Sequence, residues 1–69
     1  MALVHVRYDG QSHDIDANQL DVGIMSLDAE IKERLANYFE VPVTKFNSFQ
    51  VDRNESTGDL TVRPNAVFG

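Results

Sequence analysis

Apolar and polar residues alternate at the start of the chain, the period-two pattern of a β-strand with two different faces. One face carries Ala2, Val4, Val6 and Tyr8. Asp9-Gly10 follows and predicts a tight hairpin turn, because both residue types tolerate positive φ. Residues 11–16 then return as a second, mostly polar strand, which we expect at a sheet edge or with one face in water.

The middle of the chain changes to a helical period. A helix is predicted over residues 27–40, with Ser26 as its N-cap. Val41-Pro42 should end it, because the residue before a proline is disfavoured in the α conformation. The apolar stripe expected to face the core is formed by Leu27, Ile31, Leu35, Tyr38 and Phe39. Residues 17–24 are expected to form a connection in front of this helix.

Extended patterns return after the helix. Residues 43–51 are predicted to be extended, with a turn or bulge near Asn47-Ser48, where the alternation of apolar positions breaks. Residues 52–59 have the composition of a polar hairpin loop. A final strand follows over residues 60–63, and Pro64 ends it. The order strand, strand, helix, strand, strand predicts a two-layer α+β fold in which the helix covers one face of the sheet.

Composition narrows the class of protein. The chain has 69 residues, 42% of them apolar, which predicts one domain over residues 1–69. Six Lys and Arg against eleven Asp and Glu give a net charge of −5, and the basic residues are scattered. Nucleic acid and anionic membranes are therefore not expected as partners. No long apolar stretch, signal peptide or cysteine occurs, so we expect a cytoplasmic protein without disulfides.

Catalytic motifs are missing from the sequence. It has no cysteine nucleophile, no glycine-rich phosphate loop and no plausible Ser-His-Asp set. We therefore expect neither an enzyme nor a cofactor. Residues 52–59 resemble a calcium loop, but the glycine comes one place late and Arg63 stands where a bidentate Glu would be required. A plain polar hairpin loop is the expectation there.

The two histidines fall on facing strands of the first predicted hairpin. Around the Asp9-Gly10 turn, His5 should pair with Asp14 and Val6 with His13. Two histidines with Asp14 or Asp16 could bind a metal. The alternative, which we prefer, is two surface histidines on a wet sheet face, one of them paired with a carboxylate.

The whole chain resembles the ubiquitin-like β-grasp superfamily. The resemblance lies in the hairpin VHVRYDGQSHDID, in the helix that runs into YFEVPVTKFNSFQV with Pro42 just past its end, and in a last strand followed by a tail (residues 65–69) ending in Gly69. It implies a ββαββ β-grasp: a mixed four-stranded sheet with one helix packed across one face.

Members of this superfamily are covalent modifiers, sulfur carriers or interaction modules. Modifiers and sulfur carriers act through a C-terminal glycine, which an activating enzyme must reach. Gly69 fits that role, whereas Phe68 departs from the usual two glycines and would obstruct the same channel. The resemblance therefore leaves carrier or modifier chemistry at Gly69 as an alternative to an interaction module.

An apolar-basic sheet face is the other candidate site. The helix-facing side should use Val4, Val6, Ile15, Leu60 and Val62, or their alternates. The opposite side should carry Leu3, His5, Arg7, Thr61 and Arg63, with Phe46 or Phe49 beside them. Together with Val67 of the tail, these residues form the predicted docking face for another protein. The leading expectation is thus a small, non-enzymatic protein-interaction module.

Overall fold

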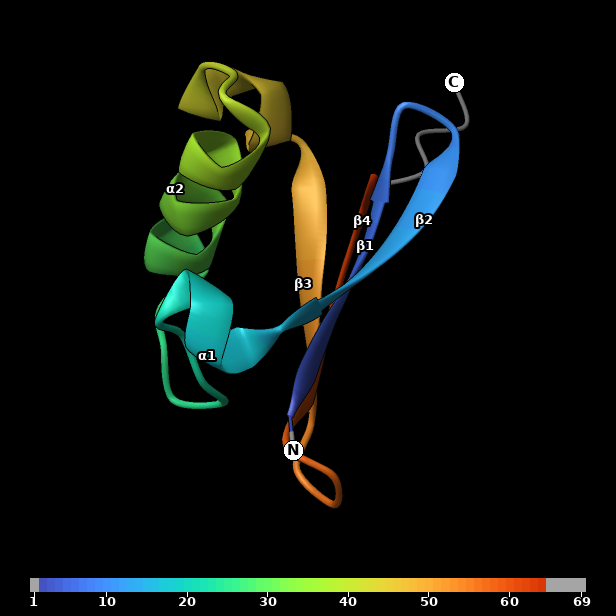
Figure 1. The fold of residues 1–69 in the computed structure, drawn as a ribbon, viewed down its shortest axis with the longest axis vertical. Coiled ribbons are helices and arrows are strands. Elements are labelled where there is room, and N and C mark those ends of the chain that lie inside the picture. The colour runs from blue at the N-terminus through green and yellow to red at the C-terminus, as the bar shows by residue number, and fades with distance from the viewer. Residues whose placement is uncertain (1, 65–69) are drawn as a thin grey trace.

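The computed structural model describes residues 2–64 as a four-stranded sheet with helices on one side (Figure 1). In chain order the elements are β1 (Leu3–Tyr8), β2 (Gln11–Asp16), α1 (Ala17–Leu20), α2 (Asp28–Phe39), the 3₁₀-helix η1 (Val43–Phe46), β3 (Phe49–Asn54) and β4 (Asp59–Pro64). The predicted two-layer α+β architecture is confirmed. Within these residues, neither α-helix has the length and apolar composition needed to cross a membrane.

The sheet is mixed, with strand order β2-β1-β4-β3. Each hairpin is antiparallel, whereas the two central strands, β1 and β4, run parallel. The register of the first hairpin is the predicted one, with His5 opposite Asp14 and Val6 opposite His13. Its turn also forms as expected, because Asp9 and Gly10 both take positive φ, 54° and 75°.

The core lies between the sheet and α2. All five residues predicted to face the helix are buried, namely Val4, Val6, Ile15, Leu60 and Val62. From the helical layer, Ile31, Leu35 and Phe46 are fully buried against them. The opposite face of the sheet carries no helix in the described residues, as Figure 1 shows. One face of the sheet is therefore left open.

The helix is shorter and rotated relative to its prediction. Ser26 does not cap it; the Ser26 hydroxyl instead accepts a hydrogen bond from the Gly23 amide at 2.9 Å. Leu27 and Tyr38 are 74% and 50% exposed, so the prediction that they face the core is wrong. The core-facing side of the helix is formed by the buried residues Ile31, Leu35 and Ala36, together with Phe39. With a rotation of roughly 100° per residue around the helix axis, the centre of this side lies about 90° from Tyr38.

Two short helices replace segments predicted without helix. Residues 17–20 form α1, which begins where the Asp16 carboxylate accepts the Asn18 amide hydrogen bond at 2.9 Å. Residues 43–46 were predicted to be extended but form η1, which turns Phe46 into the core. The predicted turn at Asn47-Ser48 is present, and the hairpin loop shortens to residues 55–58, because β3 runs to Asn54 and β4 begins at Asp59.

Candidate functional site

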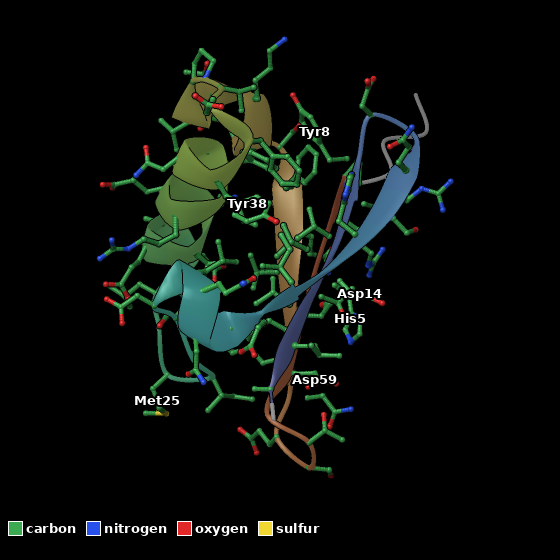
Figure 2. All side chains as sticks on the ribbon, in the orientation of Figure 1. His5, Tyr8, Asp14, Met25, Tyr38 and Asp59 are labelled. Atoms are coloured by element: carbon green, nitrogen blue, oxygen red, sulfur yellow. The ribbon has the colours of Figure 1, made fainter. Side chains whose placement is uncertain are left out.

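The open face of the sheet brings together five residues that the sequence predicted there. Side chains alternate along each strand, so the residues between the buried ones point away from α2. The five predicted residues are Leu3, His5 and Arg7 on β1 and Thr61 and Arg63 on β4; Asp59 of β4, which was not predicted there, joins them. In Figure 2, His5, Asp14 and Asp59 lie on the side of the sheet remote from the helix. Val67, Phe68 and Gly69, the other predicted site residues, lie outside the described residues.

The chemical character of this face differs from the prediction. Phe46 is not on it but fully buried, and Phe49 packs edge-on against Phe46 with ring centroids 4.8 Å apart. Carboxylates take their place, because Asp14, Asp52 and Asp59 lie among the basic residues. The expected apolar-basic face is therefore a polar face that carries both signs of charge.

A line of hydrogen bonds through His5 ties three strands together. His5 Nδ1 lies 2.7 Å from Asp14 Oδ1 on β2, and His5 Nε2 lies 3.4 Å from Asp59 Oδ2 on β4. The other oxygen of Asp59 accepts a hydrogen bond from the Leu3 amide at 2.9 Å. The predicted His5–Asp14 pair is thus confirmed, and Asp59 extends it across the central parallel strands.

The charges along this line shift the ionisation of both partners. The hydrogen bond to Asp14 is the largest cause and raises the pKa of His5; burial opposes it, and the weaker hydrogen bond to Asp59 adds to the rise. The pKa of Asp59 is lowered, first by the Leu3 amide that donates to its carboxylate and then by His5. Each group therefore favours its charged form, which is the arrangement of an ion pair.

A shallow hollow lies beside His5 on the same face. Its volume is about 170 Å³, and the polar residues that line it are His5, Arg7, Ser12, His13, Asp14, Thr61 and Arg63. The buried Val6 and Val62 also line it, so their backbone forms part of its floor. Arg63 Nε donates to Asp52 Oδ2 at 3.1 Å. Arg7 makes no ion pair or side-chain hydrogen bond within residues 2–64.

His13 does not share the wet face with His5. It lies on the helix side of β2, where its ring meets Phe39 edge-on at a centroid distance of 5.1 Å. The expectation of two histidines on one wet face is therefore wrong for His13. Since the two histidines lie on opposite faces, they cannot share a metal ion, and residues 2–64 contain no group of three metal-ligating side chains.

The polar loop between β3 and β4 is held by its own hydrogen bonds. The Asn54 side chain accepts the Ser56 amide at 3.0 Å, and Thr57 Oγ1 accepts the Asp59 amide at 3.2 Å. Gly58 takes a φ of 80°, which allows the tight reversal. These oxygens serve the turn, as in the hairpin loop that the sequence predicted.

Apolar side chains are exposed elsewhere, in front of α2. Met25 is 89% exposed and Leu27 is 74% exposed, and Figure 2 shows Met25 at the outer corner of this loop. Arg53 on β3 fixes the loop through hydrogen bonds to the carbonyls of Ile24 and Ser26 and an ion pair of 2.7 Å with Asp28. Sequence reasoning missed this feature, because it placed Leu27 in the helix stripe.

The chain was compared with family models, curated proteins and solved structures. No family model, no curated protein and no solved structure matches it.

Proposed function

We propose that the chain is a non-catalytic protein-interaction module of ubiquitin-like β-grasp fold, which binds another protein through the open face of its sheet. The fold assignment is supported by the ββαββ core order, the mixed sheet with parallel central strands and the single long helix on one side. The observation that carries the function is the uncovered face itself, with the hollow between His5, Arg7 and Arg63.

The size of the hollow supports binding of a protein surface over binding of a small molecule. Small-molecule sites usually enclose roughly 300–1,000 Å³, whereas this hollow has about 170 Å³. It is also shallow and lies on a sheet, which suits a few side chains of a partner. Strands fix the backbone of the residues around it, so little backbone entropy is lost on binding.

The roles of the titratable groups favour the same conclusion. Both nitrogens of His5 are engaged by carboxylates that belong to neighbouring strands. Asp59 also accepts a backbone amide, and Asp52 pairs with Arg63. These groups fasten the sheet and leave no free acid-base pair at the hollow, whereas the guanidinium groups of Arg7 and Arg63 remain accessible to a partner.

Photo-crosslinking in the cells that make the protein tests the proposal. A benzoylphenylalanine at position 61, in the centre of the open face, should form a discrete crosslinked adduct whose partner mass spectrometry identifies. The same residue at Glu33, exposed on α2, serves as the matched control. Arg7→Glu together with Arg63→Glu should abolish the adduct, whereas Arg34→Glu should not. An adduct from position 33 alone would refute the sheet-face proposal.

Deletion of Gly69 separates this proposal from carrier or modifier chemistry. An interaction module that uses its sheet face keeps the adduct from position 61 when Gly69 is removed. When Gly69 is removed, a modifier should instead lose its conjugates of higher mass. A sulfur carrier should lose the form in which sulfur replaces one oxygen, which intact-mass analysis detects as a heavier species. Gly69-dependent species of that kind would favour the alternative, which concerns residues outside the described part of the chain.

A further inference from the structure

Arg7 and Arg63 lie side by side although their charges repel. Val6 pairs with Val62 across the parallel strands β1 and β4, and each arginine follows directly after its valine. Both side chains therefore project from the open face at neighbouring positions and line one hollow. Like charges on adjacent strands are destabilising in the free protein. This cost is removed when an anion binds between them.

The donors around the hollow are mostly unused. A guanidinium carries five N–H donors, and Arg63 spends its Nε–H on Asp52 at 3.1 Å. Arg7 spends none on another side chain within residues 2–64, and its residue is exposed. Ser12 and Thr61, which carry hydroxyl groups, also line the hollow. The planar fork of an arginine matches a carboxylate with two parallel hydrogen bonds.

We propose that this hollow binds the carboxylate of a Glu or Asp side chain from an acidic segment of the partner protein; the inference rests on the proposed function and names the chemistry of its partner. The charges around the hollow favour a ligand with one negative charge over a ligand with two. Asp14 lines the hollow and Asp52 already contacts Arg63, so a doubly charged phosphate would be repelled by two carboxylates. The volume suits the head of one side chain.

The net charge of the chain opposes the approach of an acidic segment but does not decide binding. The net charge is −5, yet charges in water are screened beyond roughly 8 Å at physiological ionic strength. Contact with the two arginines therefore dominates once the segment is docked. A second copy of this chain would bring the same excess of negative charge over its whole surface, so we favour a local acidic segment on a different protein.

NMR titration with defined peptides tests this chemistry on the full chain. The probe is an acetylated and amidated Val-Glu-Val-Glu-Val-Glu peptide, and its control replaces every Glu by Gln. The Glu peptide should shift the side-chain Nε–H signals of Arg7 and Arg63 and the amides around Thr61, and the Gln peptide should not. Arg7→Gln should weaken binding about tenfold, the loss of one charge-assisted contact. Arg34→Gln, on α2, should leave it unchanged.

Several outcomes would overturn the inference. Equal shifts with the Gln peptide would show that the carboxylate is not recognised. Stronger shifts with inorganic phosphate than with the Glu peptide would assign the hollow to phosphate instead. Concentration-dependent shifts of the same signals without any ligand would assign it to a second copy. The amide spectrum of Arg7→Gln checks that this variant is folded, and Arg7→Lys, which keeps the charge and loses the fork, should also bind the Glu peptide more weakly.

The failure of this inference is distinguishable from failure of the proposed function. If the crosslink from position 61 persists in Arg7→Gln at the wild-type level, the sheet face binds its partner without a carboxylate in the hollow. If the crosslink never forms at position 61 but the Glu peptide still binds, the hollow recognises carboxylates and the proposed protein-docking role is wrong.

Discussion

His5 Nδ1 lies 2.7 Å from a carboxylate oxygen of Asp14, directly across the β1–β2 hairpin. Its other ring nitrogen faces Asp59 on β4 at 3.4 Å. One imidazole thus connects an edge strand with both central strands of the sheet. Because the β1–β4 contact joins the two hairpins, the protonation state of His5 bears on the cohesion of the whole sheet.

The pH dependence of stability should therefore change when Asp14 is neutralised. The pKa of His5 is raised above its ordinary 6.5, mainly by Asp14. A histidine whose pKa is higher in the folded state than in the unfolded state stabilises the fold when it is protonated. This contribution is complete at a pH below the pKa of the unfolded state and is lost as the pH rises through the pKa of the folded state. In urea unfolding from pH 5.5 to 8, the free energy of unfolding of the wild type should fall through this window, and less steeply in Asp14→Asn.

A matched control separates this effect from a change in net charge. Asp9→Asn removes one negative charge from the same hairpin, does not touch His5, and places an amide at a left-handed position that Asn tolerates. Its pH profile should parallel the wild type. Identical slopes in Asp14→Asn and in the wild type would show that the His5–Asp14 contact does not contribute to stability.

Two Glu→Gly substitutions in one region should have opposite signs. Glu40 ends α2 in the left-handed conformation with a φ of 57°, where glycine is the preferred residue. Glu40→Gly should raise the free energy of unfolding by about 1 kcal/mol, since a side chain with this conformation costs about 1–2 kcal/mol. Glu33→Gly, at an exposed interior position of α2, should lower it by about 1 kcal/mol.

Thermal or urea unfolding of the two variants measures both effects. Since each variant removes the same charged side chain, a difference in sign cannot come from electrostatics alone. A loss of stability in both variants would show that the left-handed end of α2 carries no strain that glycine can relieve.

Local signals predicted the parts of the fold whose causes are local. Asp9-Gly10 set the first turn and the register of its hairpin, because a two-residue turn leaves no freedom in the pairing. The helix was predicted, but not which of its sides faces the sheet. The spacing of its apolar residues predicts one apolar side, but it does not determine which residues at the border of that side are buried. Tyr38 lies at that edge, and only packing against the sheet determines that Phe39 and Ala36 are turned inward.

The candidate site was predicted without two of its three carboxylates. Strand alternation placed His5, Arg7 and Arg63 on one face, and the hairpin register placed Asp14 beside His5. Asp52 and Asp59 were missed because their segment has the composition of a loop, although both lie in strands. His5 on β1 and Asp59 on β4 are 54 residues apart in the sequence. No local sequence pattern could therefore predict that their side chains meet.

Phe46 should be among the most sensitive positions of the core. It is fully buried and meets the rings of Tyr8, Phe39 and Phe49. Phe46→Ala should cost about 3–5 kcal/mol, a large share of the roughly 5–15 kcal/mol that holds a typical domain folded. We expect circular dichroism to show a large unfolded fraction at 25 °C.

Val43→Ala is the matched control for this prediction. It lies in the same 3₁₀-helix but is 43% exposed, so its effect should stay within about 0.5 kcal/mol. A Phe46→Ala variant as stable as Val43→Ala would show that η1 does not deliver its aromatic residue to the core.

Arg53 should control the order of the loop in front of α2. Its guanidinium donates to the carbonyls of Ile24 and Ser26 and pairs with Asp28, so it fixes the backbone that presents Met25 to solvent. Arg53→Met keeps the apolar stem and removes every donor. Hydrogen exchange at the Ser26 amide, which donates to Gly23 at 3.0 Å, should become several-fold faster. Arg63→Met removes a guanidinium that pairs with Asp52 on the open face of the sheet, away from this loop, and should leave this amide unchanged. Equal acceleration in both variants would mean that the loss of any arginine loosens the domain, and that Arg53 has no special hold on this loop.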